Sequence, residues 1–463
     1  MNVKQSRMLI RGVFCPSKSK KFYSLYSPVD GSLLAEVPEA TEEDVELACE
    51  AAHQAFYDGW KFIDISEKRK LFSNLKISLN EFADEIHAAK VLPLGGPEVP
   101  PLVNRLIDYY VGKLDEPTGD LLEQGDNISN YIVREPLGAI AIFVPFNGPL
   151  LGTILAAIPA LIAGNTIVVK APVQEAPQAL KVMEAFNAAG FAPGVVNIVS
   201  GKEVAVGQAL AEHPRIRLIS FTGNTATGKK IMASASKDLK RLQLNLGSKT
   251  AQIICSDADI SKAVDATIGS AFPGQACSAI SRVLIHQSMR GEYLQLLKLH
   301  ASEREPCLLI DRSSIQRVEG YVDLGKKTGQ LLFGGRKPVH EKYTEGCYFE
   351  PTCFIFKDQS SPVCRDEIFG PVLSVIEFDD DDEALDLAND TEFGLLASIW
   401  TENKQRQQFF VSRLETGIVA VNNTSRINHR TPWGGFKQSG LGRRYGQLGL
   451  DVFFEYKTVW RCD

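Results

Sequence analysis

The sequence predicts an α/β fold in which two doubly wound parallel sheets carry a small additional β element. Three observations predict it. Short apolar runs alternate with helix-length amphipathic segments, this alternation occurs in two separate sets, and two β-prone segments lie outside both sets. The chain has 463 residues, a length that favours more than one domain. We therefore expect two lobes with a cleft between them.

The first set of alternating elements begins after two amphipathic helices, predicted at residues 43–57 and 67–88 from apolar positions three and four residues apart. Its predicted strands are residues 139–144, 166–170, 195–199 and 218–221, and its predicted helices are 150–163, 177–189 and 203–211. Strands alternating with helices of this length indicate βαβ units. Such sheets bind ligands at the carboxyl ends of their strands.

The second set begins at Leu242 and continues with a strand at 251–254, a helix at 260–271 and a strand at 282–285. The two β-prone segments outside both sets are residues 127–137 and 452–460. Unpaired strands rich in aromatic residues are often covered by another subunit. These segments therefore predict an interaction between copies of the chain.

Composition argues against several functions. The net charge is −6 with both signs mixed along the chain, which does not favour binding to nucleic acid or to an acidic membrane. The longest apolar stretch, 150–163, is interrupted by Gly152 and Pro159 and is shorter than the ~20 residues of a membrane span. Nine cysteines without a C-x-x-C pair, and histidines without metal-ligand spacing, predict a reduced cytoplasmic protein with no metal.

Two segments carry residues suited to chemistry. Cys277 follows a Gly-Gln turn, as a nucleophilic cysteine would, although a free cysteine is also a common inert core residue. Residues 221–229 follow a strand and open a helix, so Gly223 and Gly228 would let the chain approach a pyrophosphate. An ordinary strand-to-helix turn is the alternative for that segment.

Several segments together resemble the aldehyde dehydrogenase superfamily, in the family's order and close to its spacing. They are Pro145–Leu150, Gly164–Lys170, Phe221–Gly228, Gly274–Cys277, Glu367–Val372 and Pro432–Gly440. The resemblance spans nearly the whole chain. It implies a nicotinamide-dinucleotide-binding domain at 1–123 and 143–243, a catalytic domain at 244–438, and an oligomerisation arm at 124–142 and 439–463. A homodimer or homotetramer is expected.

The resemblance implies oxidation of an aldehyde with NAD or NADP. Cys277 would attack the aldehyde, forming a thiohemiacetal and then a thioester, which is released as the carboxylic acid. The Asn147 amide and the backbone N–H of Cys277 would stabilise the oxyanion.

The implied cofactor-binding residues are Phe146, Lys170, Gly223, Asn224, Gly228, Glu367 and Phe369. Lys170 would bind the adenosine ribose, Glu367 would hold the nicotinamide ribose, and Phe369 would pack nearby. Taken singly, these three residues could equally be a solvated charge, a surface carboxylate and a core aromatic.

One departure concerns release of the product. Hydrolytic members activate water with a glutamate in an L-E-L-G-G-K stretch, but the corresponding stretch here places Asn245 at that position. A second glutamate near the family's C-terminus is also absent, with Gln447 in its place. An amide cannot take a proton from water. Three alternatives follow: slow acid formation with water polarised by another group, transfer of the acyl group to CoA, or a non-catalytic member that binds cofactor.

Other departures concern specificity. The family often has an acidic residue shortly after the lysine at 170. If Val173 fills that position, NADP is tolerated, whereas if the loop is one residue longer, Glu175 takes the role and favours NAD. Arg426 and Arg430, near the expected substrate entrance, could bind a carboxylate on the substrate.

Overall fold

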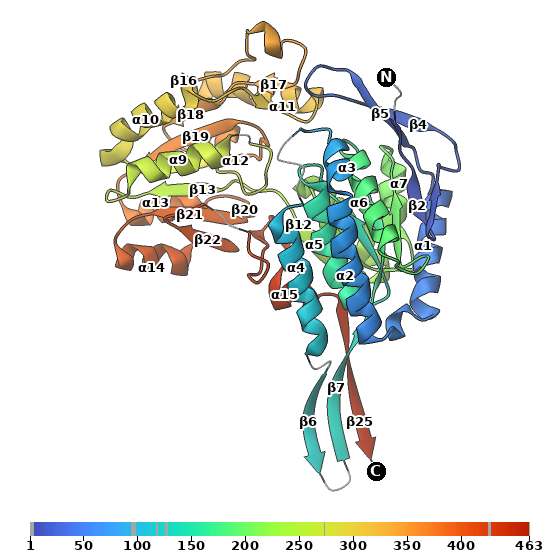
Figure 1. Cartoon of the computed structure of the whole chain (residues 1–463). Helices are drawn as coiled ribbons and strands as arrows, with labels where there is room; N and C mark the ends of the chain where they lie inside the picture. The colour runs from blue at the N-terminus through green and yellow to red at the C-terminus, as the bar shows by residue number, and fades with distance from the viewer. Residues whose placement is uncertain are drawn as a thin grey trace.

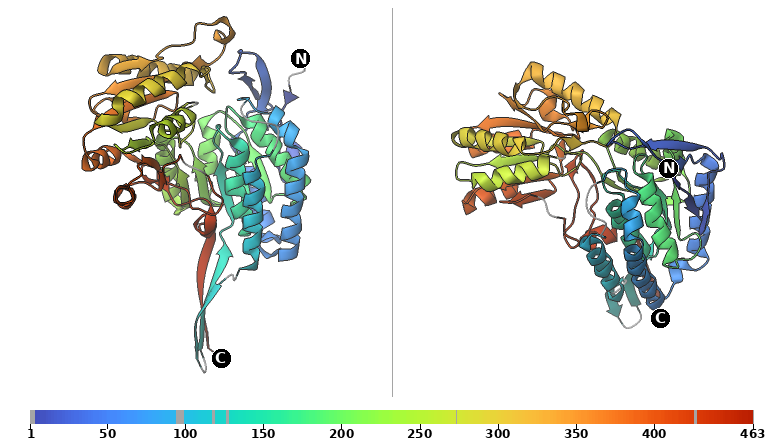
Figure 2. Two further views of the ribbon diagram at one scale, coloured as in Figure 1. Left: turned by 60° about the vertical axis from the view of Figure 1, so that its left-hand side comes forward. Right: turned by 45° about the horizontal axis from the view of Figure 1, so that its top comes forward.

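The computed structural model describes residues 4–93, 99–116, 119–125, 128–272, 274–424 and 427–462. Two α/β lobes lie side by side, and a narrow β arm projects from one of them (Figure 1). Two further views show the same division of the chain (Figure 2). The predicted fold class is confirmed. Among the described residues, no helix is both long enough and apolar enough to cross a membrane.

The first lobe is built on an eight-stranded sheet. Its strands, in spatial order, are β24 (Gly440–Leu441), β12 (Arg241–Asn245), β11 (Ile216–Thr222), β8 (Ala139–Phe143), β9 (Thr166–Lys170), β10 (Val196–Val199), β2 (Met8–Ile10) and β3 (Val13–Cys15). Strands β12 to β10 in that order are parallel, and the outer strands pair antiparallel. The central strands are short apolar runs buried on both faces, as parallel strands covered by helices require.

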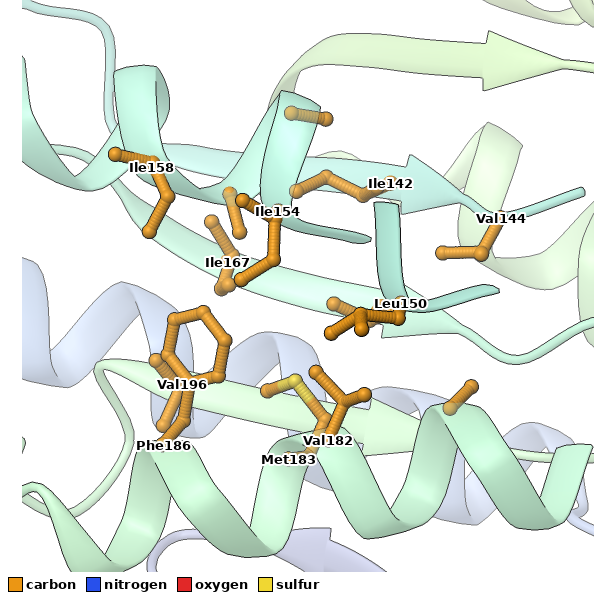
Figure 3. Packing of buried hydrophobic residues seen from close by; sticks show 14 of the residues in the cluster. Ile142, Val144, Leu150, Ile154, Ile158, Ile167, Val182, Met183, Phe186 and Val196 are labelled. Atoms are coloured by element: carbon orange, nitrogen blue, oxygen red, sulfur yellow. The ribbon is translucent and has the colours of Figure 1, made fainter. Parts of the chain in front are cut away.

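Helices cover both faces of this sheet. On one face are α1 (Glu42–Tyr57), α7 (Val204–Glu212) and α8 (Thr225–Ala235), and on the other are α2 (Ile65–Glu81), α4 (Pro101–Gly112), α5 (Pro149–Ile162) and α6 (Ala176–Ala188). Figure 3 shows how α5 and α6 pack on the sheet through side chains such as Ile154, Phe186 and Val196. The predicted helix at 67–88 is interrupted at Phe82, so α2 is followed by the short helix α3 (Ala83–Ala88).

The direction of winding reverses between β8 and β11. From β8 the chain winds outward through β9 and β10, and it then crosses to the other side to form β11 and β12. Ligands bind at such a switch point, beyond the carboxyl ends of the strands. The loops that leave β8 and β11 carry Asn147 and Asn224.

The second lobe is built on a seven-stranded sheet. Its strands, in spatial order, are β16 (Gln330–Phe333), β18 (Thr352–Phe356), β19 (Val372–Phe378), β14 (Arg282–His286), β13 (Ala251–Ile254), β21 (Leu396–Trp400) and β22 (Ile418–Val421). Helices α9 (Ile260–Ala271) and α10 (Arg290–Ser302) cover one face; α11 (Arg312–Thr328), α13 (Asp381–Asn389) and α14 (Lys404–Arg413) cover the other.

The assignment of the strand at Leu242 to the second lobe is wrong. This strand is β12, and it pairs in parallel with β11 of the first lobe, Ile219 opposite Leu242. The physical reason is that helix α8 connects β11 to β12 as a βαβ crossover, which places the two strands side by side in the same sheet. It enters the second lobe after residue 245.

The arm is a three-stranded sheet of β6 (Gly119–Gly125), β7 (Ile128–Pro136) and β25 (Phe454–Cys462). The two β-prone segments predicted outside the lobes form β7 and β25, which pair antiparallel along their full length. Within the ranges predicted for the arm, 139–142 instead belongs to β8 of the first sheet, because a run buried on both faces suits the centre of a sheet, and 440–441 forms the edge strand β24 of that sheet.

Candidate active site

The turn after β11 opens helix α8 towards the switch point. The Asn224 side chain caps the helix, with its Oδ1 accepting from the backbone N–H of Thr227 at 2.7 Å. The first N–H groups of a helix lack partners within the helix, and they attract phosphate. Gly223 and Gly228 leave no room for side chains: a Cβ would lie 2.5 Å from the Phe221 ring at Gly223 and 2.6 Å from Leu246 at Gly228. Gly228 therefore also serves helix packing.

Lys170 ends strand β9 with its ammonium largely shielded from water. Its Nζ donates to the backbone carbonyls of Ala171 at 2.9 Å and Gly201 at 2.5 Å. Burial lowers the pKa of Lys170 to about 8, opposed by the nearby charge of Glu39. A lysine ammonium has three N–H donors, so a third can bind a ribose hydroxyl.

The carboxylate of Glu175 binds backbone N–H groups of another segment and is not free to bind a cofactor. Its carboxylate accepts hydrogen bonds from the backbone N–H groups of Val91 at 3.0 Å and Leu92 at 2.6 Å, and the residue is buried. Burial raises its pKa to about 7, against the lowering effect of these two bonds. The geometry therefore favours Val173 as the counterpart of the family's acidic residue.

Cys277 lies in the segment that joins α9 to β14, half-buried against the core of the first lobe. Gly274, with a φ of +76°, brings this segment against the Gly370 backbone, where a Cβ would meet the carbonyl carbon at 2.5 Å. Burial, with a further contribution from the charge of Glu367, raises the pKa of the Cys277 thiol to about 11, and Arg444 acts in the opposite direction. One anionic and one cationic side chain thus act on the thiol in opposite directions.

Asn147 links the two lobes beside Cys277. Its Nδ2 donates to the backbone carbonyl of Gln275 at 3.0 Å, and the Gln275 side chain in turn accepts from the N–H of Ile310 at 2.9 Å. A side-chain amide has two N–H donors, so this bond fixes the orientation of Asn147 while leaving the second donor for an oxyanion.

Glu367 approaches the first lobe from the second. Its Oε1 accepts from the backbone N–H of Ser248 at 3.0 Å, and burial raises its pKa. A Cβ on Gly247 would lie 2.6 Å from the other oxygen. The absence of a side chain there lets the carboxylate reach this position, which suits an acceptor for ribose hydroxyls.

Phe369 completes this side of the site. Its ring contacts the Phe146 ring edge-on, with centroids 5.8 Å apart. Its backbone has a φ of +54°, unusual for a non-glycine residue, and Arg317 donates to the carbonyls of Ile368 and Phe369. The two rings form an apolar wall between the lobes.

Asn245 ends strand β12 and is 8% exposed. Its backbone carbonyl accepts from Gly223, but its side-chain Oδ1 is buried without a hydrogen-bond partner. Hydrogen bonds therefore join the segments of the predicted site: Asn147 contacts the segment that carries Cys277, Gly223 pairs with Asn245, and Glu367 accepts from Ser248, three residues after Asn245. Lys170 lies at the end of β9. Gln447 donates to Asp451.

Arg444 was missed by sequence reasoning. It is 5% exposed and interacts electrostatically with Cys277. The available signal was a charged pair, Arg443 and Arg444, in a segment otherwise rich in glycine. Of the two arginines predicted to bind substrate, Arg430 is exposed and Arg426 lies outside the described residues. No group of potential metal ligands is found in the described part of the chain.

Comparison with known proteins identifies the family. The model of the aldehyde dehydrogenase family matches residues 14–459. The chain is 34% identical to betaine aldehyde dehydrogenase of Bacillus subtilis over 478 residues, covering 98% of this chain and 97% of that protein. It is 33% identical over 476 residues to a mitochondrial aldehyde dehydrogenase of Leishmania tarentolae, covering 98% and 94%.

A solved structure agrees. The chain superimposes on betaine aldehyde dehydrogenase of Staphylococcus aureus in complex with NAD⁺ with a TM-score of 0.95 and 28% identity, covering 100% of this chain and 95% of that one. The protein therefore belongs to the aldehyde dehydrogenase family and is an NAD(P)-dependent oxidoreductase of aldehydes.

Proposed function

We propose that Cys277 is the nucleophile of this dehydrogenase and that Asn147 is its oxyanion donor. The observation that carries the proposal is the hydrogen bond from Asn147 to the carbonyl of Gln275, because it fixes a side-chain amide of one lobe beside the cysteine segment of the other. The Cys277 sulfur forms a bond to the aldehyde carbon, and the carbonyl oxygen becomes an oxyanion. A donor aimed at that oxygen typically contributes ~2.7–4 kcal/mol to the transition state.

The cofactor sites follow from the same geometry. Glu367 would hold the nicotinamide ribose, with Phe369 and Phe146 packed beside it, and Lys170 would hold the adenosine ribose. The start of α8, with Gly223, Asn224 and Gly228, would receive the pyrophosphate. NAD(P)⁺ accepts the hydride when bound. Loss of that hydride turns the Cys277 adduct into a thioester.

Water is the proposed acceptor of the acyl group, giving the carboxylic acid. Asn245 cannot take a proton from water, and losing a general base typically costs 10²- to 10⁴-fold in the step that it serves. The thioester should therefore accumulate, so that the first turnover is faster than later ones. CoA is the second candidate acceptor, favoured by the same absence of a base, because a thiol loses its proton to solvent far more readily than water and its thiolate can then attack the thioester.

We further propose a cytoplasmic homo-oligomer, dimer or tetramer. All nine cysteines are free thiols, as expected in a reducing compartment. The exposed β arm supplies the surface for assembly.

Rapid mixing of the enzyme with NAD or NADP and an aldehyde panel, with and without CoA, tests the proposal. We expect a stoichiometric burst of reduced cofactor, followed by slow turnover without CoA. Turnover that depends on CoA would identify an acyl-CoA product instead. Cys277→Ala should abolish the burst, whereas Cys462→Ala, which changes an exposed thiol, should retain it. A burst in Cys277→Ala would exclude Cys277 as the nucleophile.

A further inference from the structure

Arg444 is a buried cation with little to compensate its charge. It follows β24 and is 5% exposed. Its Nη2 donates to the Ser220 hydroxyl at 3.2 Å, but its Nε is buried without an acceptor. No carboxylate of a described residue forms an ion pair with it. An uncompensated buried charge is costly to the fold, so its retention calls for a role.

Arg282 shows how the same chain satisfies a structural arginine. It is 1% exposed, and its guanidinium donates to four acceptors: the backbone carbonyls of Lys249, Leu387 and Ala388 and the side chain of Gln359. Those bonds tie neighbouring segments of the second lobe together. Arg444 makes one side-chain bond, to a neutral hydroxyl. Both residues are buried, but only Arg282 has hydrogen bonds that give it a structural explanation.

Neighbouring groups hold the Arg444 guanidinium in place. The Ser220 hydroxyl that receives it donates to the Gln243 side chain at 2.8 Å, and Gln243 donates to the Arg443 carbonyl at 2.9 Å. The backbone of Arg444 is paired with Trp433 in both directions. These hydrogen bonds fix the position of the Arg444 guanidinium, but none of them comes from an anionic group.

The ionisable neighbours of Arg444 are Cys277 and Tyr445. The charged groups that act on Cys277 are Glu367, which raises the pKa of the thiol, and Arg444, which lowers it. Burial lowers the pKa of Arg444 to about 10, so it stays protonated at neutral pH. It is thus a permanent positive charge near a thiol that must ionise.

We propose that Arg444 is a positioning residue that stabilises the thiolate of Cys277 and so favours its attack on the aldehyde. The thiol releases its proton to solvent, Arg444 keeps its own protons, and the sulfur lone pair forms the bond to the aldehyde carbon. The proposal rests on Cys277 being the nucleophile.

Alkylation of Cys277 by iodoacetamide, followed across pH without aldehyde or cofactor, tests this role. Mass spectrometry of the Cys277 peptide gives the rate, and exposed Cys462 provides an internal reference. We expect Arg444→Gln and Arg444→Met to raise the midpoint pH for Cys277 by about one unit, a tenfold loss of thiolate at a given pH below it. Arg444→Lys should stay close to the wild type.

Two controls distinguish this role from others. Arg443→Gln changes the neighbouring, more exposed arginine in the same way and should leave the midpoint unchanged. Arg444→Met removes an unsatisfied buried charge and is the variant expected to fold best, as thermal unfolding would report.

An unchanged midpoint in folded Arg444→Met would overturn the proposal. So would a rise in KM confined to aldehydes that carry a carboxylate, with alkylation unaffected, because that result would identify Arg444 as a substrate anchor. The alkylation assay needs no turnover. An unchanged midpoint would therefore contradict the role of Arg444, whereas a burst in Cys277→Ala would contradict the role of Cys277 itself.

Discussion

At the scale of single residues, Asn245 limits the deacylation step. Its buried Oδ1 has no partner, so a carboxylate oxygen at that place would break no existing hydrogen bond. We expect Asn245→Glu to speed hydrolysis of the thioester at least about tenfold, because a carboxylate can accept a proton from water. The rate of cofactor reduction after the burst measures this step.

The matched control for this change is Asn245→Gln, which adds the same length without a base. It should leave the slow phase unchanged. Equal acceleration by both variants would show that side-chain length, and not basicity, governs the step.

Val173 is the residue expected to set cofactor choice. The carboxylate of Glu175 is occupied by the backbone N–H groups of Val91 and Leu92, so it is not free to bind a ribose hydroxyl. We expect the wild type to use NADP as well as NAD, and Val173→Glu to lower kcat/KM for NADP relative to NAD by about tenfold or more, since like charges repel. Val173→Gln is the uncharged control. An equal effect of both variants on both cofactors would contradict the assignment.

At the scale of elements, the buried strands were the most predictable part of the chain. Runs such as 139–143 and 166–170 are apolar throughout because both faces are covered, and they stand out from the polar turns around them. Which sheet a strand belongs to was less predictable. In the sequence, β12 reads as the first strand of the second set, and only its pairing with β11 shows that it belongs to the first lobe.

The candidate site was predictable where a residue has a characteristic setting, as Cys277 has. Arg444 could not be found in this way, because it stands out only by its burial without a carboxylate partner among the described residues and by an Nε that has no acceptor there. A sequence does not show hydrogen bonds. The same holds for Glu175, whose partners lie more than eighty positions away in the chain.

The start of helix α6 should make stability depend on pH. Glu175, just before the helix, has its pKa raised to about 7 in the folded protein, above the ~4.3 of a free glutamate. The folded state therefore favours the protonated form. The contribution of this group to the free energy of unfolding is fully present below about pH 4.3 and is lost as pH rises towards 7.

Comparison with Glu175→Gln isolates this group. We expect the difference in the free energy of unfolding between wild type and variant to fall between about pH 4.5 and 7 and then level off, as measured by urea unfolding at several pH values. A difference that stays constant over this range would show that the carboxyl group is not perturbed.

At the scale of the whole molecule, the arm is a sheet that no other described part of the single chain covers. Its three strands have no helical layer, and it extends away from the lobes (Figure 1). Trp460 is 67% exposed and Leu121 is 62% exposed. Large apolar side chains on an uncovered sheet favour burial against another copy of the chain.

We therefore expect Trp460→Glu to shift the protein towards monomers, because a buried tryptophan removes roughly 150–250 Å² from water and a glutamate would carry an unpaired charge into that interface. Sedimentation velocity gives the mass distribution. Val339→Glu, at a residue 83% exposed outside the arm, is the matched control and should leave the mass unchanged. If Trp460→Glu keeps the wild-type mass while remaining folded, assembly does not depend on this face of the arm.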